Sequence, residues 1–146
     1  MAAFEAELEQ ALRRAAEDPT DPLKAIVLRW GALAGAADLV VEAGARAARE
    51  RGDFASSLMG CREVQESLAA LVGRAGLVRL GAGRIGLLLE RGERERAALE
   101  SGRFDSQASA LAEAVRAAAL ALLGADWVGA HLDTVGGAAA GERTRA

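Results

Sequence analysis

Apolar residues recur at steps of three and four along most of the chain, and only two prolines, Pro19 and Pro22, interrupt the pattern. Residues three and four apart share one face of an α-helix, so the pattern is typical of amphipathic helices. Alanine is abundant and tyrosine is absent, whereas strands favour β-branched and aromatic residues. The sequence therefore predicts an all-α protein and excludes a β-sandwich or a β-barrel.

The apolar stripe predicts four helical segments, at residues 4–17, 22–50, 60–91 and 106–132. Asp21 is predicted as the N-cap of the second helix, with Pro22 as its first helical residue. Gly92 directly follows Arg91, which is typical of a helix end. The charged stretch at residues 93–103 is interpreted as a solvated connector or a short helix.

Short connections between long helices favour antiparallel neighbours, and we therefore expect an antiparallel four-helix bundle. We divide the chain into an N-terminal helix with a proline-containing linker at residues 1–21, the bundle at residues 22–135, and a flexible tail at residues 136–146. The length of 146 residues suits a single domain.

The formal net charge of −3 argues against nucleic acid as a partner, because nucleic-acid binding usually requires a basic surface. No apolar run is long enough to span a membrane. Cys61 is the only cysteine, which fits a reducing compartment, and acidic residues interrupt any signal-peptide pattern at the N-terminus. We expect a cytoplasmic protein with no nucleic-acid or membrane partner.

Residues 81–86, Gly-Ala-Gly-Arg-Ile-Gly, match the G-x-G-x-x-G pattern of dinucleotide-binding proteins. We reject this interpretation because the helical stripe passes through the glycines and no neighbouring segment predicts a parallel sheet. The interior of the same segment holds five glycines, at positions 73, 76, 81, 83 and 86. Each costs about 1 kcal/mol relative to alanine inside a helix, so we expect close helix packing, or else a ligand against the backbone, to offset the cost.

The second helical segment is followed by Arg-Gly-Asp-Phe-Ala-Ser-Ser-Leu at residues 51–58, and the third carries Val64-Gln65 and Leu68-Ala69. This arrangement resembles the C-terminal helical domain of acyl-CoA dehydrogenases, in which an R-x-x-F-G-x-x-L turn joins two long helices. The resemblance covers residues 23–133 and is most specific at residues 51–69. It implies part of a flavin-dependent oxidoreductase that acts on acyl thioesters and binds FAD.

The resemblance implies four cofactor-binding residues. Arg51 would contact the FAD pyrophosphate, as guanidinium groups pair well with phosphate, and Phe54 would shape the cofactor pocket. Cys61 and Arg62 would approach the cofactor from the turn. The residues alone leave a structural alternative open, in which Arg51 is a cation at a helix C-terminus and Phe54 anchors the turn in the core.

Acyl thioester dehydrogenation needs a carboxylate beside the α-carbon of the substrate. The family places this acid near the start of the first long helix or in a late loop. No Asp or Glu occurs from Pro22 to Ala37, and no Y-E-G-T-like loop follows. We expect no catalytic residue here, and dehydrogenase activity only if further domains or a partner subunit complete the site.

Two hypotheses follow. The chain completes a flavin enzyme together with a longer acyl-CoA dehydrogenase subunit, or it is a non-catalytic module for oligomerisation or protein interaction that has lost flavin binding. A homodimer or homotetramer is expected in either case, since the mean hydropathy is +0.11 and leaves apolar surface to cover. No metal site is expected: His131, the only histidine, is interpreted as a buried or capping residue and Cys61 as inert.

Overall fold

The computed structural model describes residues 6, 10, 20–50 and 62–132. Residues 20–50 and 62–132 form four helices: α2 (Pro22–Glu50), α4 (Arg62–Glu90), α5 (Arg94–Leu123) and α6 (Ala125–His131). These residues contain no strand, which confirms the predicted all-α class for this part of the chain. The expected helix at residues 4–17, apart from Ala6 and Gln10, which are both helical, and the expected tail lie outside the described residues.

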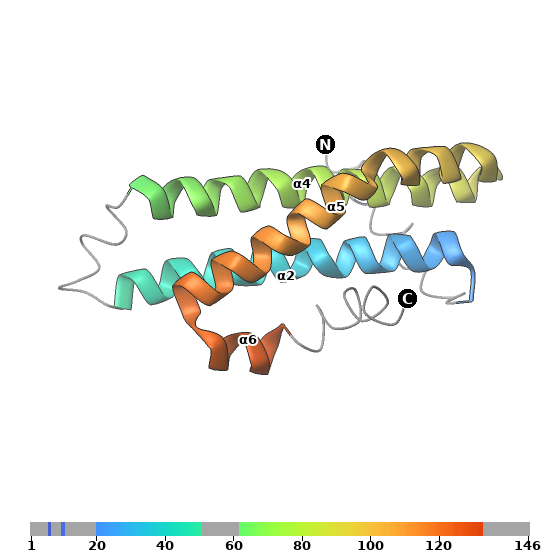
Figure 1. Ribbon diagram of the computed structural model, residues 1–146. Helices are drawn as coiled ribbons and strands as arrows, with labels where there is room; N and C mark the ends of the chain where they lie inside the picture. The colour runs from blue at the N-terminus through green and yellow to red at the C-terminus, as the bar shows by residue number, and fades with distance from the viewer. Residues whose placement is uncertain (1–5, 7–9, 11–19, 51–61, 133–146) are drawn as a thin grey trace.

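Helices α2 and α4 pack side by side in opposite directions (Figure 1). Gly44, late in α2, lies against Leu68, early in α4. Asp38, earlier in α2, forms an ion pair with Arg79, later in α4. The predicted antiparallel arrangement is therefore confirmed for this pair.

Helix α5 returns antiparallel to α4 and crosses the bundle obliquely (Figure 1). Phe104 of α5 lies against Gly81 of α4, and Arg84 of α4 donates a hydrogen bond of 3.3 Å to Glu100 of α5. Later residues of α4 thus meet earlier residues of α5. The three long helices form an up-down-up bundle, and α6 packs against α5.

The core lies between the three long helices and consists of aliphatic side chains and alanines. The largest fully buried side chains are Val27, Val40, Leu71, Val78, Ile85 and Leu111. Burial of each such side chain contributes roughly 1.5–3 kcal/mol. The periodic positions of these residues in the sequence are the reason that each segment turns one face inward.

Gly81 allows α4 and α5 to approach closely. A Cβ atom at this position would lie 2.7 Å from Cδ1 of Phe104 and 2.8 Å from its Cγ. The Phe104 ring also packs edge-to-face against Trp30, with ring centroids 6.4 Å apart. Close packing therefore explains Gly81. The glycine motif at residues 81–86 lies inside α4 rather than after a strand, which confirms the rejection of the dinucleotide interpretation.

The turn between α4 and α5 spans only three residues. Gly92 adopts φ +76°, and its N–H donates to the carbonyl of Leu89 at 3.1 Å, while Glu93 N–H donates to that of Leu88 at 2.9 Å. This pair of hydrogen bonds defines a Schellman motif, in which a glycine in the left-handed region satisfies the last carbonyls of a helix. The predicted helix end at Gly92 is confirmed.

Residues 94–103 are neither a solvated connector nor a separate short helix, the two interpretations made from the sequence, but form the first part of the long helix α5. Helix α5 begins at Arg94, and Ala97 and Glu100 are buried on the same helical face as Ala108 and Leu111. Arg and Glu are themselves strong helix formers, so a high charge density does not oppose a helix. The helical period continues through the charged stretch into the apolar segment.

The expected single helix at residues 106–132 is also incorrect. Gly124 adopts φ +91°, which ends α5 at Leu123 and starts α6 at Ala125. Because a right-handed helix requires negative φ, the chain bends at this glycine. Val128 and Leu132 then turn inward and are buried against the core.

Asp21 connects two helix starts. Its Oδ1 accepts a hydrogen bond of 3.0 Å from Leu23 N–H, which confirms the predicted N-cap of α2. Its two carboxylate oxygens also accept bonds of 2.8 and 2.7 Å from the guanidinium of Arg94. The hydrogen bonds from Arg94 hold the pKa of Asp21 well below its ordinary value.

We predict that Gly81→Ala destabilises the fold by about 1–3 kcal/mol, since the new methyl group overpacks the contact with Phe104. This loss exceeds the gain of about 1 kcal/mol that alanine provides inside a helix. Urea unfolding followed by circular dichroism measures the change. Gly102→Ala is the matched control, because nothing lies within 4 Å of its added Cβ, and it should stabilise the protein; stabilisation by both substitutions would contradict the packing argument.

We also predict a pH-dependent contribution from Asp21. Its lowered pKa means that the folded state favours the ionised carboxylate, so the contribution is complete well above the ordinary value of 3.8 and is lost as the pH falls below it. Asp21→Asn keeps an N-cap but removes the charge. The difference in unfolding free energy between wild type and this variant should therefore be larger at pH 7 than at pH 3. An equal difference at both pH values would show that the ion pair contributes nothing.

Candidate functional site

Three of the four residues expected to bind FAD, Arg51, Phe54 and Cys61, lie outside the described residues. The fourth, Arg62, is the first residue of α4. Its side chain is 90% exposed, and its Nε lies 3.3 Å from Oε1 of Glu66. Arg62 therefore presents its guanidinium to solvent at the end of the bundle where α2 ends and α4 begins (Figure 1).

His131 is the last residue of α6 and is exposed, not buried. Its ring stacks on Trp127 with centroids 4.5 Å apart, and its Nδ1 lies 3.0 Å from the carbonyl oxygen of Trp127. Both contacts lie within α6, and the expectation of a buried His131 was wrong. Within residues 20–50 and 62–132, no cluster of three or more His, Cys, Asp or Glu side chains could hold a metal ion.

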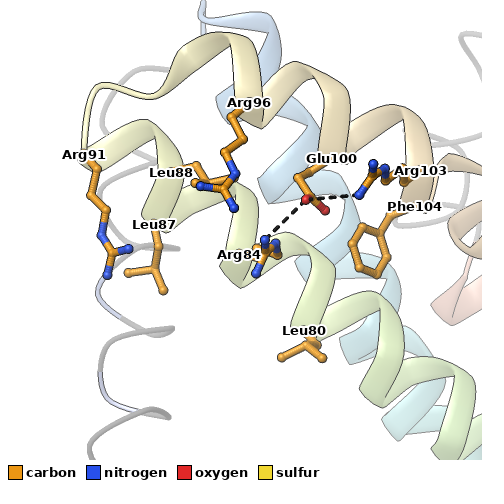
Figure 2. A pocket seen from close by; sticks show the side chains of 9 residues that line it. All are labelled: Leu80, Arg84, Leu87, Leu88, Arg91, Arg96, Glu100, Arg103 and Phe104. Carbon is orange, nitrogen blue, oxygen red and sulfur yellow. Dashed lines mark hydrogen bonds and ion pairs between the residues drawn. The ribbon is translucent and has the colours of Figure 1, made fainter.

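Among the described residues, a groove of about 520 Å³ lies between α4 and α5, close to the turn that joins them. Its apolar part consists of Leu80, Leu87 and Leu88 from α4 and Phe104 from α5. Four arginines surround these side chains (Figure 2). The groove therefore combines an apolar surface with a basic rim.

Two of the four arginines precede Gly92 in the turn between α4 and α5, and two follow it. Arg84 lies in α4 and Arg91 is the first residue after α4, while Arg96 and Arg103 lie in α5. Each pair is separated by seven residues, or about two helical turns, and the helices run antiparallel. The spacing therefore turns all four side chains toward one groove.

One carboxylate, that of Glu100, lies among these four guanidiniums. Its Oε1 is 3.3 Å from Arg84 and 3.7 Å from Arg103, and Figure 2 shows the two arginines on either side of it. The lining residues thus carry a formal charge of +3. Glu100 is itself buried, with 8% of its surface exposed, so its charge is tied to these two partners.

The other two arginines make no contact with Glu100 that is short enough for an ion pair. Arg96 lies 3.7 Å from Glu93, which is outside the lining, and both side chains are about half exposed. In the described part of the chain, no ion pair or hydrogen bond involves the side chain of Arg91. Sequence reasoning missed this groove because it interpreted the charged stretch at residues 93–103 as a solvated connector or a short helix. The signal that could have found it is the seven-residue spacing of arginines on both sides of Gly92.

A second feature is the outer face of α4. We define it by six exposed residues that share one helical stripe: Ala69, Val72, Gly73, Gly76, Leu77 and Leu80. Val72 is 54% exposed, Leu77 39% and Leu80 43%. This face is apolar along about three helical turns, although it faces solvent.

Comparison with known proteins finds no matching family model, no matching curated protein and no matching solved structure. The described helices define the chain as an all-helical bundle. In the described segments, no helix has the length and apolar character needed to cross a bilayer.

Proposed function

We propose that this chain is a helical association module that forms a homodimer through the outer face of α4. The observation that carries the proposal is the exposure of Val72, Leu77 and Leu80 on one stripe of a long helix. Contiguous apolar surface of this kind marks interaction sites in proteins. Burial of the stripe against a second copy would remove it from water.

Two glycines on the same face support a close contact between helices. Gly73 and Gly76 lie in the interior of α4, where each costs about 1 kcal/mol relative to alanine. Unlike Gly81, neither has any atom within 4 Å of an added Cβ. Packing inside the described chain therefore does not offset the helix-propensity cost of these two glycines. Close packing of a partner helix directly on them would offset it.

The order of residues along the face is self-complementary. In an antiparallel pair of α4 helices with the two-fold axis midway between Gly73 and Gly76, each Gly73 meets Gly76 of the other copy. Val72 then meets Leu77, and the small Ala69 meets the large Leu80. An isologous dimer requires that one surface fit itself in this way, and this requirement favours a second copy over an unrelated partner.

Leu77→Glu should convert the dimer to a monomer, because the interface would bury an unpaired carboxylate. Analytical ultracentrifugation of the full chain over a micromolar concentration range measures the mass. Leu99→Glu is the matched control: Leu99 lies on α5 and is 71% exposed, so it should leave the mass unchanged while adding the same charge. A monomeric wild-type protein, or an unchanged mass in Leu77→Glu, would reject the proposal.

A second candidate function is completion of an FAD site, as the resemblance to acyl-CoA dehydrogenases implies. It is supported by the antiparallel packing of α2 and α4, which brings Glu50 and Arg62 to the same end of the bundle. Arg62 is exposed there, and its remaining guanidinium N–H groups suit phosphate oxygens. In this function, oxidation of an acyl thioester requires a longer dehydrogenase subunit that supplies the base.

Titration of the full chain with FAD tests this candidate, with quenching of flavin fluorescence as the measure of binding. Arg51→Ala should weaken binding about tenfold or more, because a charge-assisted contact to the pyrophosphate is worth roughly 1.5–3 kcal/mol. Arg46→Ala is the control, since Arg46 is exposed on α2 and pairs with Glu42. Equal affinity in wild type and Arg51→Ala, or no binding by the wild-type chain, would reject an FAD site that this chain forms by itself through Arg51.

A further inference from the structure

We propose that the groove between α4 and α5 binds a small amphiphile that carries a phosphate monoester headgroup and an alkyl or acyl chain. The site consists of the groove described above, with its four arginines and its apolar side chains. It is distinct from the outer face of α4 proposed for dimerisation, and it shares only Leu80 with that face.

The positive charge of the groove favours an anionic headgroup. The lining carries a formal charge of +3, whereas the whole chain carries −3. A phosphate monoester carries close to two negative charges at pH 7 and offers three oxygens, so it neutralises more of the groove than a carboxylate does. Guanidinium groups also match phosphate oxygens with paired, parallel hydrogen bonds.

The four guanidiniums differ in how readily they could contact this headgroup. Arg91 and Arg103 are the most available, since Arg103 is 78% exposed and contacts Glu100 only at 3.7 Å. Arg84 is held closer to Glu100, at 3.3 Å, and its position is therefore set before a ligand arrives. Preorganised groups reduce the entropy lost on binding.

The apolar side chains of the groove favour a ligand that also carries an alkyl or acyl chain. Leu80 and Leu87 of α4 and Phe104 of α5 line the groove next to the guanidiniums (Figure 2). An alkyl chain could lie along them while the headgroup stays at the rim. A volume of about 520 Å³ is typical of pockets for one small molecule. A single dispersed amphiphile therefore fits the groove better than a flat membrane surface does.

Isothermal titration calorimetry of the full chain at low salt, with dodecyl phosphate below its micellar concentration, tests the proposal. We expect one ligand per chain. Dodecanoate, inorganic phosphate and the neutral dodecyl maltoside should each bind at least about fivefold more weakly, because each lacks part of the charge or the apolar chain. Equal affinity for the neutral amphiphile would overturn the proposal, as would binding to anionic phospholipid vesicles without binding of dispersed dodecyl phosphate.

Substitutions locate the binding site. Arg91→Ala and Arg103→Ala should each weaken dodecyl phosphate binding about threefold to tenfold, in the range of a partly exposed charge pair. Arg74→Ala is the matched control on the exposed surface of α4, outside the groove lining, and should leave the affinity unchanged. Equal weakening by all three variants would show general charge attraction and would reject the site.

Glu100→Gln should strengthen the binding of dodecyl phosphate, whereas the arginine substitutions weaken it. The amide keeps the shape of the side chain but removes the one carboxylate among the lining residues, so the positive charge acting on the ligand increases. Dodecyl phosphate should bind this variant more tightly than wild type, by about threefold or more. Circular dichroism confirms that the variant is folded; in a folded variant, unchanged or weaker binding would overturn the electrostatic argument.

Discussion

The contact between Gly81 and Phe104 determines how the three long helices fit together. Because Gly81 lacks a Cβ, the aromatic ring of Phe104 lies directly on the backbone of α4. The ring also packs edge-to-face against Trp30 of α2, so one residue of α5 joins both neighbouring helices. The turn at Gly92 then brings the beginning of α5 back along the end of α4. The basic groove exists because these two constraints place two helical surfaces side by side.

Most of the fold could be predicted from sequence, since helix formation here depends on local periodicity and on a few strong end signals. Asp21 and Pro22 begin α2, and Gly92 ends α4, for reasons that operate within a few residues. The errors arose at residues 93–103 and at Gly124. The charged stretch carries its inward face on Ala97 and Glu100, and a buried glutamate is invisible to a search for apolar residues. Gly124 could equally have continued or broken a helix, and only its φ of +91° distinguishes the two outcomes.

The functional surfaces were less accessible to sequence reasoning, because they depend on contacts between helices. The resemblance directed attention to Arg51 and Phe54, which lie outside the described residues. The groove instead requires that Arg84 and Arg103 face each other across a hairpin, and no single helix shows this. Similarly, the five glycines in the interior of the third predicted helical segment look alike in sequence. The structure separates Gly81, which is explained by packing, from Gly73 and Gly76, which are not.

The distribution of charge explains why the groove, and not the exposed surface in general, is assigned to a ligand. On the outer surface of α2, Arg46 lies four residues after Glu42 and pairs with it, the ordinary arrangement for a solvated helix. In the groove, Arg84 and Arg103 share one buried carboxylate, and two further arginines lie nearby. Glu100 balances only one of these four positive charges, so the lining keeps a formal charge of +3 that attracts an anion. The outer face of α4 is apolar and instead favours burial against another apolar surface.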